Sequence, residues 1–149
     1  MKNEQLKIIV ESLIDITEKA GKKTIELYNS GLKIIKKPDE SPVTNGDLEV
    51  DKMIKEKIKE LTPDIPIISE ESVDLKIRNT LKTYWLLDPI DGTKEYISGK
   101  DVYTLNAGLI IDRIPSLGII GVPKKNRLFY SYGKGNSYLI EKNNKIKLD

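Results

Sequence analysis

Two aspartates at the end of an apolar run, Asp88 and Asp91, have the residue type and spacing of metal ligands. Pro89 holds Asp88 in an extended conformation and cannot continue a strand, while Gly92 allows the chain to turn. We therefore expect the two carboxylates to converge at the mouth of a strand, with the carbonyl of Ile90 between them in sequence. Such a set of oxygen donors suits Mg2+, which takes octahedral oxygen coordination and keeps several waters.

The residues that follow these aspartates could bind an anion. The amides of Gly92 and Thr93 are placed to open a short helix, and a helix N-terminus with free N–H groups attracts phosphate. A structural alternative exists, because two aspartates in this spacing, with a proline and a glycine, also make a β-turn that caps a strand. The residues of this segment alone leave both interpretations open.

The composition narrows the chemistry that the chain can perform. The sequence contains no cysteine and no histidine. It therefore excludes a serine–histidine–aspartate triad, a cysteine–histidine pair and a disulfide framework, and it argues against zinc. Carboxylate and carbonyl oxygens remain, and these suit hard cations such as Mg2+.

Charge and hydropathy argue against two classes of partner. Lys and Arg number 25 and Asp and Glu number 23, for a net charge of +2, which does not favour binding to a nucleic acid polymer. Short basic pairs such as Lys36-Lys37 are expected to be solvated. No apolar run reaches the roughly 18 residues needed to cross a membrane, and Glu4, Glu11 and Asp15 interrupt any signal-peptide core. We expect a cytoplasmic protein with no membrane partner.

Two helices are predicted in the first half of the chain. Apolar residues recur at three- and four-residue spacing over residues 6–27, which predicts one long helix that ends at Gly31. A short strand is expected over residues 32–35, followed by a polar loop over residues 37–42. A second helix is expected to begin near residues 45–47.

The second half of the chain is predicted to consist of strands. Short apolar runs between turn residues predict strands over residues 66–68, 84–87, 105–111, 116–122, 128–130 and 138–140. Pro89 is expected to end the second of these strands. The pattern indicates an α+β fold, with two long helices packed on a mainly antiparallel sheet.

Three motifs, taken in order, resemble those of one family. They are Ser41-Pro42-Val43-Thr44 followed by Asp47, then Ile68-Ser69-Glu70-Glu71-Ser72, then Asp88-Pro89-Ile90-Asp91-Gly92-Thr93. Together they are similar to motifs of the inositol monophosphatase superfamily, and the likeness extends over nearly the whole chain. The resemblance implies the N-terminal half of a sugar-phosphatase-type fold. Lys94-Glu95-Tyr96 resembles the 3'(2'),5'-bisphosphate nucleotidase branch, although Lys94 and Glu95 could equally be solvated helix residues.

The resemblance also implies a role for each motif residue. The implied ligands of two or more Mg2+ ions are Glu70, Asp88, Ile90 through its carbonyl, and Asp91. The implied catalytic residues, which orient and deprotonate the attacking water, are Asp47, Glu70 and Thr93. The residues implied to bind the substrate phosphate are Glu70, Ile90, Asp91, Gly92 and Thr93.

Some of these assignments have a structural alternative. Asp47 also fits the acidic residue that the helix dipole favours in a first turn. Thr44 fits a neighbour of the helix N-cap with no chemical role. Glu70 and Glu71 cannot be distinguished by physical reasoning, and only the motif selects Glu70.

The activity implied by the resemblance is a Mg2+-dependent phosphomonoesterase. It would hydrolyse 3'(2'),5'-bisphosphate nucleotides, for example adenosine 3',5'-bisphosphate to AMP, by metal-activated water. Two alternatives stay open: an inactive truncated or split-gene remnant that binds metal only, and an inositol monophosphatase. The substrate of either active form is a small anionic phosphate compound.

The family has a C-terminal domain that this sequence is not expected to contain. In the family, a Trp-Asp element of that domain completes the second metal site, whereas the single tryptophan here, Trp85, belongs to the motif around Asp88. We expect residues 1–149 to form one N-terminal phosphatase domain with weak or no activity alone. The expected completing partner is a second copy of the chain or a separate polypeptide with the C-terminal half.

Overall fold

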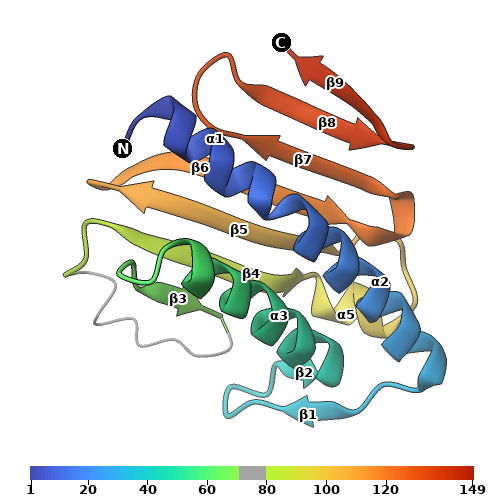
Figure 1. Cartoon of the computed structure of the whole chain (residues 1–149). Coiled ribbons are helices and arrows are strands. Elements are labelled where there is room, and N and C mark those ends of the chain that lie inside the picture. Colours follow the sequence, from blue (N-terminus) through green and yellow to red (C-terminus); the bar gives the residue numbers. More distant parts are fainter. Residues whose placement is uncertain (71–79) are drawn as a thin grey trace.

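The computed structural model describes residues 1–70 and 80–149 of the chain. Within them, seven strands form one sheet in the order β3-β4-β5-β6-β7-β8-β9 (Figure 1). The strands are β3 (Ile67–Ser69), β4 (Tyr84–Asp91), β5 (Thr104–Ile111), β6 (Ile114–Val122), β7 (Arg127–Ser131), β8 (Ser137–Glu141) and β9 (Asn144–Leu148). Neighbouring strands are antiparallel except β3 and β4, which run parallel. The prediction of a mainly antiparallel sheet is confirmed.

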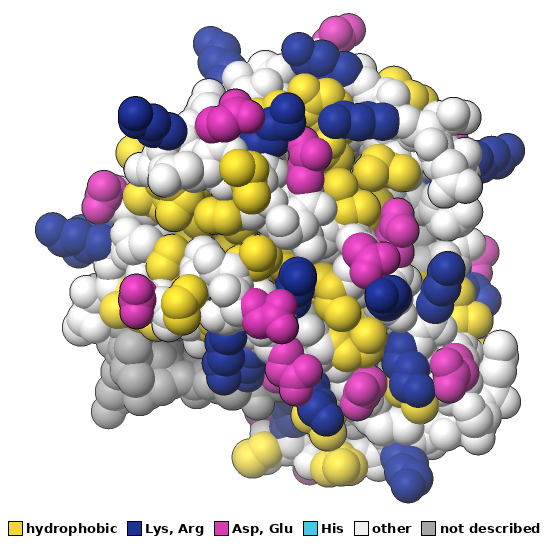
Figure 2. Space-filling view, in the orientation of Figure 1, with side chains coloured by type: hydrophobic (Ala, Val, Ile, Leu, Met, Phe, Trp, Pro, Cys, Tyr) yellow, Lys and Arg dark blue, Asp and Glu magenta, His cyan; other side chains and the backbone are white. Residues whose placement is uncertain are grey.

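Three helices cover one face of this sheet (Figure 1). They are α1 (Asn3–Ser12), α2 (Ile14–Ser30) and α3 (Asn45–Leu61). Their apolar stripes pack against every second residue of the strands, because alternate strand residues share a face. The core between the two layers includes Val10, Leu13, Val50, Ile54, Ile58, Trp85, Leu87, Leu105, Leu109 and Ile119. Acidic and basic side chains are interspersed on the outer side of the helices (Figure 2), and the predicted α+β fold is confirmed.

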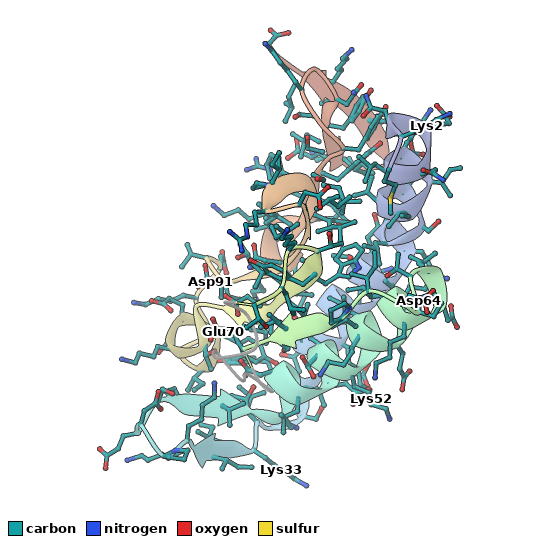
Figure 3. All side chains as sticks on the ribbon, turned by 90° about the vertical axis from the view of Figure 1, so that its left-hand side faces the viewer. Lys2, Lys33, Lys52, Asp64, Glu70 and Asp91 are labelled. Atoms are coloured by element: carbon teal, nitrogen blue, oxygen red, sulfur yellow. The ribbon has the colours of Figure 1, made fainter. Side chains whose placement is uncertain are left out.

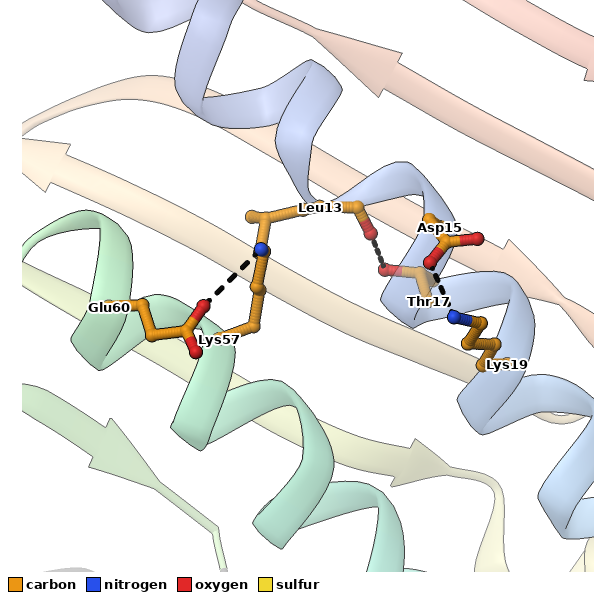
Figure 4. A network of polar contacts seen from close by, with 6 residues as sticks. All are labelled: Leu13, Asp15, Thr17, Lys19, Lys57 and Glu60. Carbon is orange, nitrogen blue, oxygen red and sulfur yellow. Dashed lines mark hydrogen bonds and ion pairs between the residues drawn. The ribbon is translucent and has the colours of Figure 1, made fainter.

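The prediction of one helix over residues 6–27 is wrong at Leu13, where α1 ends and α2 begins. The Leu13 amide donates to the Val10 carbonyl three residues back, at 3.0 Å, which tightens the turn. The Thr17 hydroxyl also donates to the Leu13 carbonyl, at 2.7 Å (Figure 4), so a side chain shares an acceptor with the helix backbone. The predicted helix end is confirmed, because Gly31 follows α2 with a φ of 95°.

Strand β4 continues through Pro89, although the sequence predicts that it ends there. The pairing with β5 shifts register between Asp88, opposite Asn106, and Asp91, opposite Thr104. Pro89 has no N–H to donate to a neighbouring strand. Because the regular pairing with β5 is interrupted at the register shift, no ladder hydrogen bond from Pro89 is required. The strand therefore carries both aspartates to its end instead of stopping at the first.

Two strands lie where the sequence predicts none. Strand β2 (Pro42–Thr44) begins inside the predicted loop and pairs with β1 (Ile34–Lys36) as a separate hairpin. Strand β9 follows a tight turn at Lys142 and Asn143, both with positive φ. All but one of its residues are exposed, so it has no buried face to impose an alternating hydrophobic pattern.

The face of the sheet opposite α1, α2 and α3 is hollowed. Leu86, Ile120 and Phe129 point to this face and line a groove of about 580 Å³. Ile120 is 42% exposed, in contrast to the buried core residues on the helix side. In the described part of the chain, no helix is both long and apolar enough to cross a membrane.

Candidate functional site

An open cleft of about 350 Å³ lies where β4 ends. Its lining gathers most of the predicted site residues: Glu70, Asp88, Ile90, Asp91, Gly92 and Thr93. Glu70 directly follows β3, whereas Asp91 is the last residue of β4 (both labelled in Figure 3). Asp47 is buried behind Thr93, with only 1% of its surface exposed. Segments far apart in the sequence thus meet at one cleft.

The chain leaves β4 through a glycine turn into a short helix, α5 (Thr93–Ile97). Gly92 has a φ of 91°, a left-handed conformation that side chains disfavour. A Cβ atom at this position would also lie 3.1 Å from a carboxylate oxygen of Glu95. The predicted turn and the helix that opens at Thr93 are therefore confirmed.

Asp47 links the start of α3 to the cleft. One carboxylate oxygen, Oδ2, accepts from the Thr44 amide at 2.9 Å and from the Thr44 hydroxyl, while the Asp47 amide donates back to Thr44. This reciprocal pair is a capping box. Asp47 and Thr44 therefore make the helix-capping contacts that were expected as the alternative to a chemical role. The other oxygen, Oδ1, accepts from the Thr93 hydroxyl at 2.8 Å. Capping therefore fixes the carboxylate that receives the hydroxyl of Thr93.

Strand β3 delivers Glu70 to the side of β4. Ser69 is in parallel register with Leu87, and the Glu70 amide donates to the Leu87 carbonyl at 3.0 Å. Glu70 and Asp88 line the same cleft and the same groove, so Glu70 lies on the same side of the sheet as Asp88. Glu71 lies outside the described residues, so the choice of Glu70 over Glu71 stays a prediction.

The donor set of the cleft fits a hard cation in its chemistry, because it consists of carboxylate and carbonyl oxygens. The three carboxylates Glu70, Asp88 and Asp91 share the cleft. Among residues 1–70 and 80–149, however, no three such side chains lie close enough together to form a ready ligand group. The structure therefore places the three carboxylates in one cleft. That they converge on a shared ion and act as its ligands stays a prediction.

Two lysines balance part of the acidic charge in the cleft. Lys37, from the turn between β1 and β2, and Lys94, from α5, line it together with the carboxylates. Sequence reasoning assigned Lys37 to a solvated pair, because the turn that returns it to the cleft depends on the unpredicted pairing of β1 with β2. The site therefore presents both acidic and basic groups to a ligand.

Tyr96 holds α5 against the helices and was missed as a site residue. Its hydroxyl donates to the Thr24 carbonyl at 2.6 Å, and its ring lies 4.7 Å from the ring of Tyr103. Burial, followed by the neighbouring Tyr103 and the charge of Asp47, raises the pKa of Tyr96 far above its usual value. Its spacing from Thr93, one helical turn, was a usable signal, because both side chains lie on the same face of α5.

The cleft joins the groove on the open face of the sheet. Glu70 and Asp88 line both hollows. Asn106, opposite Asp88 in the pairing of β4 with β5, also lines the groove. Any group that occupied the groove would therefore lie next to two of the predicted metal ligands.

Comparisons with known proteins agree with this arrangement. The 3'(2'),5'-bisphosphate nucleotidase CysQ of Aggregatibacter actinomycetemcomitans is 33% identical over 142 residues, which cover 94% of this chain and 53% of the relative. The solved structure of CysQ from Bacteroides thetaiotaomicron is 30% identical, with a TM-score of 0.65, and the match covers 88% of this chain and 48% of that one.

A more distant structure shows the same fold. An IMPase/NADP phosphatase solved in complex with Mg2+ and phosphate is 17% identical, with a TM-score of 0.78 and coverage of 90% of this chain and 51% of that one. The chain spans about half the length of the curated relatives it matches. The family model described as the inositol monophosphatase family matches residues 5–148. Since this match takes in nearly the whole chain, the protein belongs to the inositol monophosphatase family.

Proposed function

We propose that this chain contributes the catalytic half-site of a Mg2+-dependent phosphomonoesterase that acts on 3'(2'),5'-bisphosphate nucleotides. The observation that carries the proposal is the hydrogen bond from Thr93 to the buried Asp47 at the edge of the carboxylate cleft. Membership of the family and the similarity to CysQ nucleotidases support the same activity. The Mg2+ and phosphate of the more distant relative support the choice of metal.

The residues that would hold Mg2+ are Glu70, Asp88, the Ile90 carbonyl and Asp91. When bound in such sites, Mg2+ lowers the pKa of a coordinated water and neutralises charge on the attacking and leaving oxygens. The chain's own carboxylates would hold the ions at one wall of the cleft, and the turn at Gly92 would leave room for a phosphate beside them. Hydrolysis by this route needs no histidine.

Thr93 and Asp47 would orient the attacking water. The Thr93 hydroxyl donates its hydrogen to Asp47 Oδ1, which leaves lone pairs on the Thr93 oxygen to accept a hydrogen from water. Asp47 is nearly completely buried and its other oxygen is held by Thr44, so this acceptor cannot easily turn away. With its hydrogen directed to Asp47, the Thr93 oxygen would accept a hydrogen bond from the water in one preferred orientation and would assist its deprotonation.

Lys94, which lines the cleft beside the carboxylates, favours a substrate with more than one phosphate. A second phosphate of a substrate bound at the carboxylates could meet this ammonium group. This argument supports a bisphosphate nucleotide over an inositol monophosphate. The similarity to nucleotidases named for such substrates points in the same direction.

The test is phosphate release measured with and without Mg2+. Adenosine 3',5'-bisphosphate and inositol 1-phosphate are compared as substrates, for the chain alone and for the chain mixed with a polypeptide that supplies the other half of a CysQ relative. The proposal expects Mg2+-dependent release from the bisphosphate in the mixture and less release, or none, from the chain alone. Preference for inositol 1-phosphate would favour the inositol monophosphatase alternative, and Mg2+ binding without turnover in the mixture would favour the metal-binding remnant.

A further inference from the structure

A second carboxylate of helix α3 contacts the last residue of β3, which directly precedes Glu70. Asp51 lies one turn after Asp47, and its Oδ1 accepts a hydrogen bond from the Ser69 hydroxyl in β3. Its Oδ2 is 3.0 Å from the Nζ of Lys55, and the Asp51 side chain is only 14% exposed. Both oxygens of Asp51 are therefore engaged, and one of them holds the residue directly before Glu70.

Ser69, the last residue of β3, and Glu70, which follows it in a turn, lie on opposite sides of the sheet. Ser69 points toward α3 and is completely buried, whereas Glu70 points with Asp88 to the face that carries the cleft. The Glu70 amide is held at the same time by the Leu87 carbonyl. The hydrogen bond from the Ser69 hydroxyl to Asp51 thus holds β3 on its helix-facing side, at the residue directly before Glu70.

We propose that Asp51 is a positioning residue for Glu70, and that the first two turns of α3 brace both flanks of the cleft. Asp47 receives the hydroxyl of Thr93 on one flank, and Asp51 receives the hydroxyl of Ser69 on the other. The inference rests on the proposed function for the role of Glu70 as a metal ligand. The position of Glu70 itself does not depend on that function.

Other charged pairs on the helices differ from this contact. Asp15 with Lys19 and Lys57 with Glu60 join residues of the same helix at exposed sites (Figure 4), where ion pairs contribute little. The contact of Asp51 instead joins a helix to a strand 18 residues away and is partly buried. Its loss is expected to loosen the end of β3 and not only the helix surface.

The first measurement is amide hydrogen exchange at Glu70 in Asp51→Ala and Ser69→Ala, followed by NMR. The matched control is Glu60→Ala, which removes an exposed ion pair from the same helix. Each of the two test variants is expected to speed exchange at the Glu70 amide by about 10-fold through local opening. Amides in the middle of β5 and β6, and all amides of the control, are expected to keep their wild-type rates.

The second measurement is the affinity for Mg2+ by titration calorimetry, at a temperature where all variants are folded. Loss of a group that orients a metal ligand is expected to weaken Mg2+ binding by about 10-fold. The double variant D51A/S69A is expected to bind no more weakly than the weaker single variant, because both act through one hydrogen bond.

The outcomes separate the positioning role from the proposed function. Unchanged exchange at Glu70, or equal acceleration of all amides, would overturn the positioning role. Wild-type affinity for Mg2+ in D51A would overturn its link to the metal site. A wild-type chain that binds no Mg2+ would remove the proposed function, while the exchange rates would still decide whether Asp51 positions Glu70.

Discussion

Thr93 donates its hydroxyl hydrogen to Asp47 across 2.8 Å, although 46 residues separate them in sequence. The acceptor is buried at the N-terminus of α3, and the donor is the first residue of α5. This contact connects the helical layer to the end of β4, where the carboxylate cleft opens. A short hydrogen bond between elements this distant requires both helices to be docked correctly on the sheet.

Replacing Thr93 with valine is expected to lower phosphate release by about 100-fold in the mixture of this chain with the other half of a CysQ relative. Valine keeps the shape of threonine but cannot orient a water. Asp47→Asn is expected to cause a similar loss, since its amide is a poorer acceptor. The matched control is Thr83→Val, just before the opposite end of β4, which is expected to keep wild-type activity. Full activity in Thr93→Val, measured as kcat at saturating substrate and Mg2+, would exclude the proposed role.

Mg2+ is expected to stabilise the chain against thermal unfolding, because an ion that binds only the folded state shifts the unfolding equilibrium. At a Mg2+ concentration of 100 times its Kd the gain is about 2.7 kcal/mol. Asp88→Asn and Asp91→Asn are expected to remove most of this gain, since each takes a negative charge from the cleft.

The control for the metal experiment is Asp112→Asn, in the turn between β5 and β6. Asparagine tolerates the positive φ of that position, so the fold should be unaffected. The change in melting temperature on adding Mg2+ is compared across the variants by calorimetry. An equal Mg2+-induced rise in Asp88→Asn and the wild type would show that the ion binds elsewhere.

Local patterns in the sequence predicted most elements of the fold. Apolar spacing identified α3 and six strands of the main sheet, and the glycine at position 92 identified the turn that opens α5. The correctly predicted elements share a cause, because each depends on residues that are neighbours in the chain or repeat with the period of an element. Glu70, Asp88 and Thr93, which come from two of the motifs, line one cleft, and their roles there stay predictions.

The failures involve contacts that local patterns do not encode. The extension of β4 past Pro89 depends on a register shift that only the partner strand defines. The contact between Asp51 and Ser69 depends on how α3 docks beside β3. Asp51 lies four residues after Asp47 and therefore on the same helix face, but only the tertiary structure shows which strand that face meets.

Gly46 and Tyr96 are expected to be energetically coupled. A Cβ atom at position 46 would lie 2.7 Å from the Tyr96 hydroxyl oxygen and 2.8 Å from a ring carbon, so Gly46→Ala must displace the ring. Tyr96→Phe alone is expected to cost about 1 kcal/mol, through the lost hydrogen bond to the Thr24 carbonyl. The double variant is expected to be about 1 kcal/mol more stable than additivity predicts, because removing the hydroxyl relieves part of the overlap.

Urea unfolding of the wild type, both single variants and the double variant measures this coupling. A matched control pairs Tyr96→Phe with Gly108→Ala, because the nearest atom to an added Cβ at Gly108 is 3.6 Å away and does not belong to Tyr96. That pair is expected to be additive. Additive behaviour of Gly46→Ala with Tyr96→Phe would contradict the close contact between α5 and the start of α3.

The single tryptophan reports on a buried hydrogen bond that ties α3 to the sheet. The indole Nε1 of Trp85 donates to the Thr62 hydroxyl oxygen at 3.0 Å, and both residues are buried. Thr62→Val keeps the shape but leaves the indole N–H without an acceptor, which is expected to cost about 1–3 kcal/mol of unfolding free energy. Urea unfolding followed by Trp85 fluorescence measures the loss, with Thr83→Val as the control, because the hydroxyl of Thr83 accepts from the Asp112 amide at an exposed site. If Thr62→Val unfolds at the same urea concentration as the wild type, the indole must find another acceptor, and the bond does not hold the end of α3.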